Sequence, residues 1–237
     1  MEYSPVLAVA TAAFEIVVAA WALGRVRRSH DERSVLLTTS AILLLLAAYQ
    51  LAEVAICADV TAAGFGPRLA FIIVTWLPPL DLLLIAQLRK PRSRVTSGAA
   101  YAMLAAAAGM VVWISVDRSF ATASVCNAVY ARYVHAMPRF FIYSSFYWVG
   151  LLEMVLLSGY GALACRDKRR RGQLMQLFVG TLAFVVPSIA LSWFVPPARG
   201  ALPSIMCHFA LVFAVCLARL IHLEGRWAEQ EAVAQPG

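Results

Sequence analysis

Five ionisable side chains stand within otherwise apolar stretches of this sequence: Glu15, Glu53, Asp81, Glu153 and His208. Ionisable groups are costly inside a lipid bilayer and usually face a cavity or a partner there. They are therefore the first candidates for chemistry. A carboxyl group beside an imidazole can act as an acid and base pair, which makes Glu53 and His208 the candidate catalytic residues.

Helical spacing adds neighbours to this pair. Tyr49, Gln50 and Glu53 follow i, i+3 and i, i+4 steps, so Gln50 and Glu53 share one helix face. At 1.5 Å per residue, Glu53 and His208 lie roughly 6–10 Å below the outer ends of their helices. We expect a polar pocket that opens outward and includes these residues. The candidate ligand-binding residues are Tyr49, Gln50, Trp76, Asp81, Glu15 and Glu153.

A purely structural role is an alternative for each of these groups. A Glu53–His208 contact could simply join two helices, since interhelical polar contacts contribute about 0.6–2 kcal/mol. Glu15 and Glu153 could be hydrogen-bonded structural acids near mid-membrane. Asp81 follows Pro78–Pro79 and could satisfy carbonyl groups that the prolines release.

Composition predicts the elements that position these residues. Of the 237 residues, 62% are hydrophobic and 14% are charged, whereas soluble domains have about 45–50% apolar and 25% charged residues. A bilayer-spanning helix needs about 20 apolar residues. The sequence therefore predicts an all-α integral membrane seven-helix bundle over 1–222 and a short cytoplasmic tail over 223–237. The helices are expected near 5–24, 35–57, 68–88, 97–115, 139–164, 174–195 and 202–222.

Basic residues indicate the orientation of the bundle. Of the 20 Lys and Arg residues, fifteen fall in the segments after the first, third, fifth and seventh helices. Because Lys and Arg accumulate on the cytoplasmic side, the N-terminus is expected outside and the C-terminus inside. We expect a multi-pass protein of the inner (cytoplasmic) membrane. Its net charge of +7 predicts contact with anionic lipid headgroups and no nucleic-acid partner.

Prolines and cysteines mark special positions. Pro78–Pro79 falls inside the third expected helix and Pro187 inside the sixth, so both helices should kink. Cys57 closes the second helix, and Cys126 lies in the longest outer loop, about 116–138. These two cysteines can pair in an oxidising exterior and tie the loop over the bundle. The loop is either a functional segment or a lid over the bundle mouth.

No cofactor is expected. One histidine, one glutamate and scattered thiols lack the dense spacing of a metal site, so the sequence predicts no metal. A retinal Schiff base needs a lysine inside the last helix. The only lysines are Lys90 and Lys168, both in loops expected on the cytoplasmic side, which excludes a microbial-rhodopsin-type protein.

Three short motifs carry a resemblance: YQLAE at 49–53, LPPL at 77–80 and PSIMC at 203–207. The chain resembles a diffuse group of bacterial seven-helix proteins of unknown function. That group has Tyr/His-Gln-x-x-Glu in helix two, Leu-Pro-Pro-Leu-Gly in helix three and Pro-Ser-x-x-Cys in helix seven. This chain departs from it at Asp81, where the group has Gly. The resemblance implies the seven-helix fold and no particular activity.

Two other families share fewer features with the chain. Small seven-helix terpene cyclases are similar in size and in having a Glu in helix two, but they use a second acid in helix seven, where this chain has His208. Ceramidase-like membrane hydrolases need several histidines with Ser and Asp to hold zinc. Here only His208 lies well inside a helix.

Three function classes remain open from the sequence. The first is binding or transformation of a lipid or isoprenoid-like molecule, a small amphiphilic ligand, with Glu53 as acid or base and His208 as its partner. The second is a seven-helix sensor that signals through a separate partner. The third is a transporter or proton-coupled channel subunit that uses the mid-membrane acids. No internal repeat pairs the helices, which argues mildly against a repeat-built transporter.

Overall fold

The fold is a bundle of long apolar helices with one small hairpin. The computed structural model describes residues 4–26, 33–60, 65–89, 93–127, 131–135, 137–194 and 202–234. Seven spans in this part of the chain are long and apolar enough to cross a membrane. This confirms the predicted helical bundle of a multi-pass membrane protein. The elements are α1 (Val6–Val26), α2 (Arg33–Cys57), α3 (Phe65–Thr75), α4 (Leu77–Leu88), α5 (Arg94–Val116), β1 (Ala121–Cys126), β2 (Ala131–His135), α6 (Met137–Ala164), α7 (Lys168–Phe194) and α8 (Leu202–Ala234).

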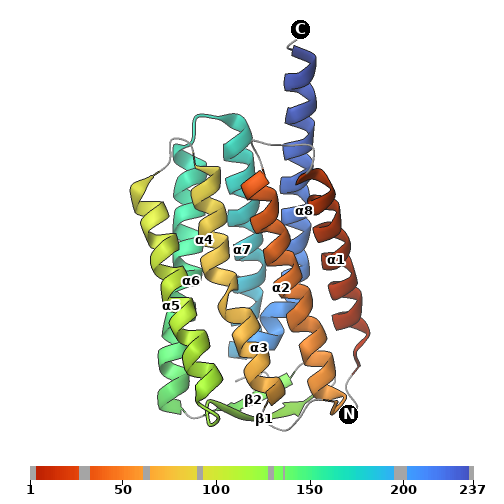
Figure 1. The fold of residues 1–237 in the computed structure, drawn as a ribbon, viewed down its shortest axis with the longest axis vertical. Coiled ribbons are helices and arrows are strands. Elements are labelled where there is room, and N and C mark those ends of the chain that lie inside the picture. Colours follow the sequence, from red (N-terminus) through yellow and green to blue (C-terminus); the bar gives the residue numbers. More distant parts are fainter. Residues whose placement is uncertain are drawn as a thin grey trace.

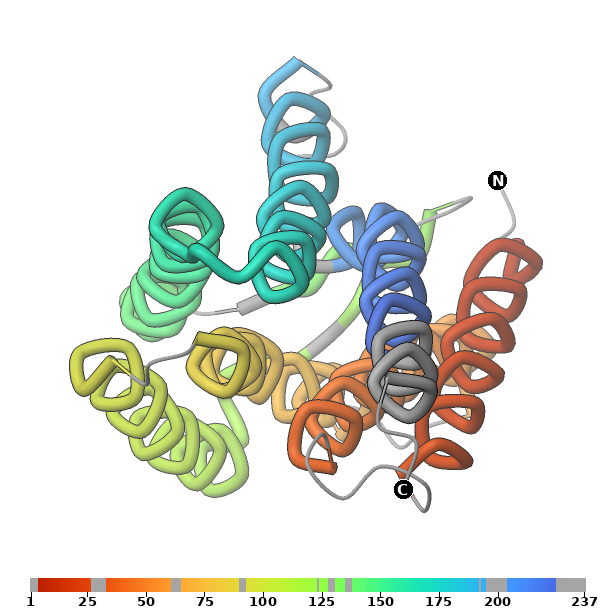
Figure 2. The backbone as a smooth tube through the Cα atoms, turned by 90° about the horizontal axis from the view of Figure 1, so that it is seen from above, coloured from red at the N-terminus to blue at the C-terminus, as the bar shows by residue number. Residues whose placement is uncertain are grey.

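The helices pack side by side, and the β1–β2 hairpin crosses one end of the bundle (Figure 1). The view along the bundle shows α8 between α1 and α7 (Figure 2), and α8 also packs against α2. The most deeply buried spans are α2, α8 and the pair formed by α3 and α4, whereas α5 and α6 expose most of their surface. Polar residues on α2, α4 and α8 therefore meet in the interior.

The third span is broken where the sequence predicts a kink. Helix α3 ends at Thr75 and α4 begins at Leu77, so Pro78 and Pro79 lie in the first turn of α4. Proline fits a first turn because its missing N–H would have no partner there. Helix α6 approaches this break closely at Gly150, where an added Cβ would stand 2.6 Å from the Cβ of Pro78. Pro187, in contrast, lies inside a continuous α7.

The long loop between α5 and α6 contains two antiparallel strands, which the sequence analysis did not anticipate. A disulfide between Cys57 and Cys126, with Cα atoms 5.7 Å apart, ties β1 to the end of α2. Helix α2 ends there because Asp59 adopts a left-handed conformation and Val60 N–H returns to the carbonyl of Ala55. The hairpin is therefore a lid fastened to the bundle.

An aromatic layer lies directly beneath this lid. The ring of Phe71 on α3 meets Phe120, Tyr133, Phe140 and Tyr143, with centroids 5.2–6.1 Å apart in edge-on geometry. Such pairs contribute about 0.5–1.5 kcal/mol each beyond the area that they bury. The layer fixes the hairpin against α3 and α6.

Helices α7 and α8 are longer than predicted at the end of the bundle opposite the hairpin. Helix α7 begins at Lys168 and not near 174, because Asp167 caps it by accepting a hydrogen bond from the Arg169 N–H at 2.9 Å. The basic run 168–171 is thus helical and not part of a loop. Helix α8 continues past the expected end at 222 to Ala234, so most of the expected tail 223–237 is helix.

Candidate functional site

The polar face of α2 is completely enclosed. Tyr49, Gln50 and Glu53 are each at most 1% exposed. The Tyr49 hydroxyl lies 3.3 Å from the hydroxyl of Tyr133 in the hairpin. Gln50 Nε2 donates a hydrogen bond of 2.6 Å to the backbone carbonyl of Cys207 on α8. The predicted α2 face therefore contacts both the lid and α8.

His208 occupies a less enclosed position on α8. Its ring is partly buried, and Nδ1 donates to the carbonyl of Ser204, one turn earlier in the same helix, at 2.8 Å. Gln50 reaches the residue just before it. The pairing of Glu53 with His208 stays a prediction. Trp76, the other expected member, lies partly buried between α3 and α4.

Cys207 is the position where polar groups from several helices converge. Its carbonyl accepts the Gln50 hydrogen bond. The carboxyl groups of Glu53 on α2 and Glu15 on α1 lie within electrostatic range of its thiol. Together with Tyr49 and Asp81, these residues form what we call the interior polar cluster: Glu15, Tyr49, Gln50, Glu53, Asp81 and Cys207. The sequence analysis noted Cys207 only as the last residue of the PSIMC motif and did not include it among the candidate site residues.

Asp81 lines a small cavity beside Cys207. The cavity has a volume of about 20 Å³, which is room for one or two water molecules. Helices α2, α4, α6, α7 and α8 all contribute to its wall, and among the described residues that line it Asp81 is the only one with an acidic or basic side chain of the Asp, Glu, Lys or Arg type. Tyr147 faces the cavity from α6. That residue shares a helix face with Leu151 and Met154 at i, i+4 and i+7, a spacing that could have revealed it.

The two remaining acids differ from each other. Glu15 is 0% exposed, and neither carboxylate oxygen has a hydrogen-bond partner within the described residues. Glu153 lies on the more exposed helix α6 and is only partly buried. Glu153 and Trp76 do not line the Asp81 cavity. The structure thus brings Glu15 into the polar cluster and leaves Glu153 outside it.

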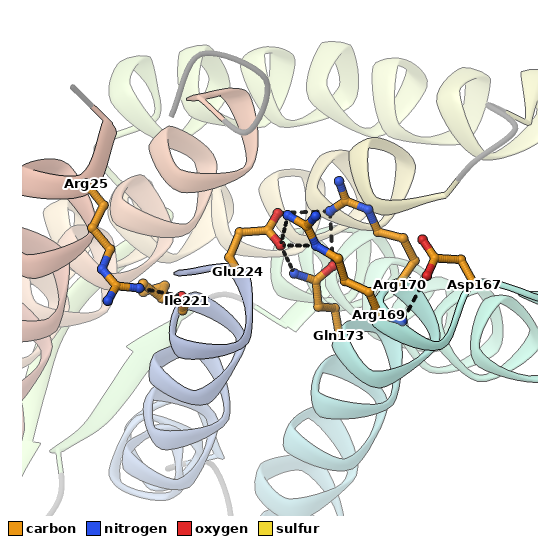
Figure 3. A network of polar contacts seen from close by, with 7 residues as sticks. All are labelled: Arg25, Asp167, Arg169, Arg170, Gln173, Ile221 and Glu224. Carbon is orange, nitrogen blue, oxygen red and sulfur yellow. Dashed lines mark hydrogen bonds and ion pairs between the residues drawn. The ribbon is translucent and has the colours of Figure 1, made fainter. Parts of the chain in front are cut away.

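A second buried polar group was missed entirely by the sequence analysis. At the opposite end from the hairpin, Glu224 on α8 accepts hydrogen bonds from Arg169, Arg170 and Gln173 on α7 (Figure 3). The ion-pair distances are 2.8 Å to Arg169 and 3.0 Å to Arg170. Arg170 and Glu224 are each 3% exposed. Nearby, Arg25 on α1 donates to the carbonyl of Ile221 at 3.1 Å.

A third charged group lies at the hairpin end of the bundle, which we call the rim. Asp117 follows α5 and pairs with Arg139 of α6 at 3.2 Å. The hydrogen bond from the Ser119 hydroxyl lowers the pKa of Asp117 below its usual value, and the Ser119 N–H and the Arg139 charge lower it further, against a smaller desolvation effect that raises it. This pair is open to solvent, with side chains 43% and 19% exposed for Arg139 and Asp117.

Within the described ranges, no three His, Cys, Asp or Glu side chains gather in a way that could hold a metal ion. No family model, curated protein or solved structure matches this chain. Its function must therefore be argued from the geometry of the interior polar cluster.

Proposed function

We propose that this chain is a membrane-embedded binding protein for an amphiphilic, lipid or isoprenoid-like molecule, whose polar group reaches the interior polar cluster. The observation that supports this most is the convergence of Glu15, Gln50, Glu53 and Asp81 from three helices around Cys207 of α8. Polar groups at membrane depth are costly and usually mark a ligand or ion pathway.

The orientation that we propose places the hairpin outside and the C-terminus in the cytoplasm of a bacterial inner membrane. Two independent features support it. Arginine-rich segments lie at the end of the bundle opposite the hairpin, as the positive-inside rule requires for a cytoplasmic end. The Cys57–Cys126 disulfide lies at the hairpin end, and disulfides persist in oxidising compartments outside the cytoplasm.

A ligand would reach the polar cluster by separating packed elements. The cavity of about 20 Å³ is far smaller than the roughly 300–1,000 Å³ of a typical ligand pocket. The disulfide fastens one strand of the lid to α2, and the aromatic layer holds both strands against α3 and α6. Lateral entry from the bilayer, beside the more exposed α6, would suit an amphiphile better than entry through this lid.

The test is mass spectrometry of small molecules and lipids that co-purify with the protein in mild detergent. We expect one species to be enriched in the wild type and lost in Glu53→Gln and His208→Ala. Glu153→Gln is the matched control, because it makes the same chemical change at an acid outside the polar cluster. If Glu53→Gln and His208→Ala retain the species but unfold at a lower temperature, the residues are structural and the proposal is wrong.

A sensor role is the second candidate, and the length of α8 favours it. One continuous helix carries Cys207 in the polar cluster and, near its other end, Glu224, which forms what we call the Glu224 network with Arg169, Arg170 and Gln173. The helix then continues to Ala234. Its 33 residues correspond to about 50 Å, and it extends beyond the other helices (Figure 1). A shift of α8 on ligand binding would therefore reach a cytoplasmic partner. Crosslinking at positions 225–234 with and without ligand would detect such a partner.

A further inference from the structure

The cavity at Asp81 has a lining that restricts what it can hold. Its wall is built mainly of aliphatic, aromatic and sulfur-containing side chains, and one carboxyl group enters it. The rings of Tyr147, Phe184 and Phe213 are part of that wall. The described wall is therefore apolar and aromatic, with a carboxyl group at a single point.

Asp81 itself is held without a described partner. The residue is 3% exposed, and its Oδ1 has no hydrogen-bond partner within the described part of the chain. It stands one turn after Leu77, where α4 restarts behind the break at Trp76. One oxygen of this cavity-lining carboxyl group therefore lacks the hydrogen-bond partner that burial in a bilayer requires.

The chemistry of the wall selects among possible occupants. Divalent cations such as Ca²⁺ take six to eight oxygen ligands, and this wall offers one carboxyl group. A primary ammonium group needs less, because one carboxylate can accept its hydrogen bonds and aromatic faces attract the remaining positive charge. An ammonium group is also close in size to a water molecule, which matches a cavity of about 20 Å³.

We infer that the Asp81 cavity binds a primary ammonium group, carried either by a free amine or by the headgroup of an amphiphile. This inference rests on the proposed function and names the headgroup class of its ligand. The carboxylate pairs with the ammonium ion, and the first methylene groups lie against the apolar wall formed by residues such as Leu151 and Phe213.

The test compares hexylammonium with hexan-1-ol, which has the same chain and no charge, by isothermal titration of the purified full-length protein in a nonionic detergent. We expect the wild type to bind the amine at least tenfold more tightly than the alcohol. Asp81→Asn should bring this ratio close to one. Glu153→Gln, which alters an acid that neither lines the cavity nor belongs to the interior polar cluster, should leave the ratio unchanged.

A variant that fills the cavity and leaves Asp81 unchanged provides an independent check. Ala210 lines the cavity and is 4% exposed, so Ala210→Leu should fill the space and abolish binding of the amine while Asp81 remains. Methylammonium distinguishes the two sources: binding as tight as that of hexylammonium indicates a free amine, and much weaker binding indicates an amphiphile. Equal affinity of the wild type for amine and alcohol, binding of neither, or an unchanged ratio in Asp81→Asn would each overturn the inference.

The two proposals can fail separately. If a co-purified species is lost in Glu53→Gln but the wild type shows no preference for amines, the protein binds an amphiphile and the ammonium site is wrong. If the amine preference depends on Asp81 but Glu53→Gln retains the co-purified species, the cavity binds ammonium groups and the proposed role of Glu53 is wrong.

Discussion

The interior polar cluster and the Glu224 network differ in how their acidic side chains are paired. Glu224 is surrounded by Arg169, Arg170 and Gln173, and each described contact is a hydrogen bond or ion pair. Asp81 and Glu15 are equally buried, yet Asp81 Oδ1 and both Glu15 oxygens lack hydrogen-bond partners among the described residues. Paired charges hold helices together, whereas buried carboxyl oxygens without a hydrogen-bond partner are available to bind a ligand. The difference separates a structural site from a candidate functional one.

The largest expected effect follows from removing the acid of the network. Glu224→Ala leaves two arginines, one of them fully buried, without their carboxylate. Breaking a buried ion pair in this way destabilises a protein by about 3–5 kcal/mol. We expect a loss of that size in the free energy of unfolding, measured by SDS titration in mixed micelles. Replacing Glu224 with Leu and Arg169 and Arg170 with Met together should cost less than Glu224→Ala alone. A small effect of Glu224→Ala on the free energy of unfolding would mean that the paired charges around Glu224 do not stabilise the fold more than the acids of the interior polar cluster do.

Removing the disulfide should have the next largest effect. The bond closes a segment with a sequence separation of 69 residues, and disulfides typically contribute about 2–4 kcal/mol. The double variant Cys57→Ser/Cys126→Ser should lose stability in this range and expose the hairpin to proteolysis near Arg132. Cys165→Ser is the control, because Cys165 is a free cysteine at the end of the bundle opposite the hairpin. If the hairpin stays protected without the disulfide, the aromatic layer alone holds the lid.

The features of the fold that the sequence predicts are those that depend on residues close together in the chain. Hydropathy predicts seven spans because each span must be apolar over its own length, and Pro78–Pro79 predicts the break at Trp76 because proline lacks an N–H. The Arg170–Glu224 pair joins residues 54 positions apart. No periodicity in one helix indicates such a partner.

One part of the candidate site could likewise be predicted from spacing within a helix, and another part could not. Gln50 and Glu53 could be grouped because they share a helix face, and the structure encloses both. The Asp81 cavity could not be predicted, since five helices form its wall and its shape depends on their packing. The hairpin was missed for a related reason: its strands become stable only when paired with each other and packed on the aromatic layer.

Neutralising the unpaired acids should have little effect on folding. Asp81→Asn and Glu15→Gln replace carboxyl groups in which Asp81 Oδ1 and both Glu15 oxygens have no described hydrogen-bond partner. We therefore expect each variant to change the free energy of unfolding by less than about 1 kcal/mol, because the amide has nearly the same shape as the carboxyl group and no described hydrogen bond is lost. The measurement is the same SDS titration as for Glu224→Ala. A loss comparable to that of Glu224→Ala would mean that these acids are structural as well.

The smallest effect is expected at the rim beside the hairpin, where an acid and an arginine pair as in the Glu224 network but with greater exposure to solvent. Asp117 pairs with Arg139 and Ser119, but exposed ion pairs contribute little. The hydrogen bond from Ser119 and the charge of Arg139 lower the pKa of Asp117. The carboxylate's contribution is therefore complete above its ordinary pKa of about 3.9 and is lost as the pH falls through the lowered value.

Hydrogen exchange of the Ser119 amide reports this change directly, because that N–H donates to Asp117 Oδ1 at 3.0 Å. After correction for the intrinsic exchange rate, its protection should be constant from about pH 7 to pH 5 and should decline below about pH 4. Asp117→Asn should show low protection at every pH. Because the rim does not contact the interior polar cluster in any described hydrogen bond, ligand binding should be the same in Asp117→Asn as in the wild type. An amine preference that changed with this substitution would mean that rim and interior are coupled, and that pairing alone does not separate structural charges from functional ones.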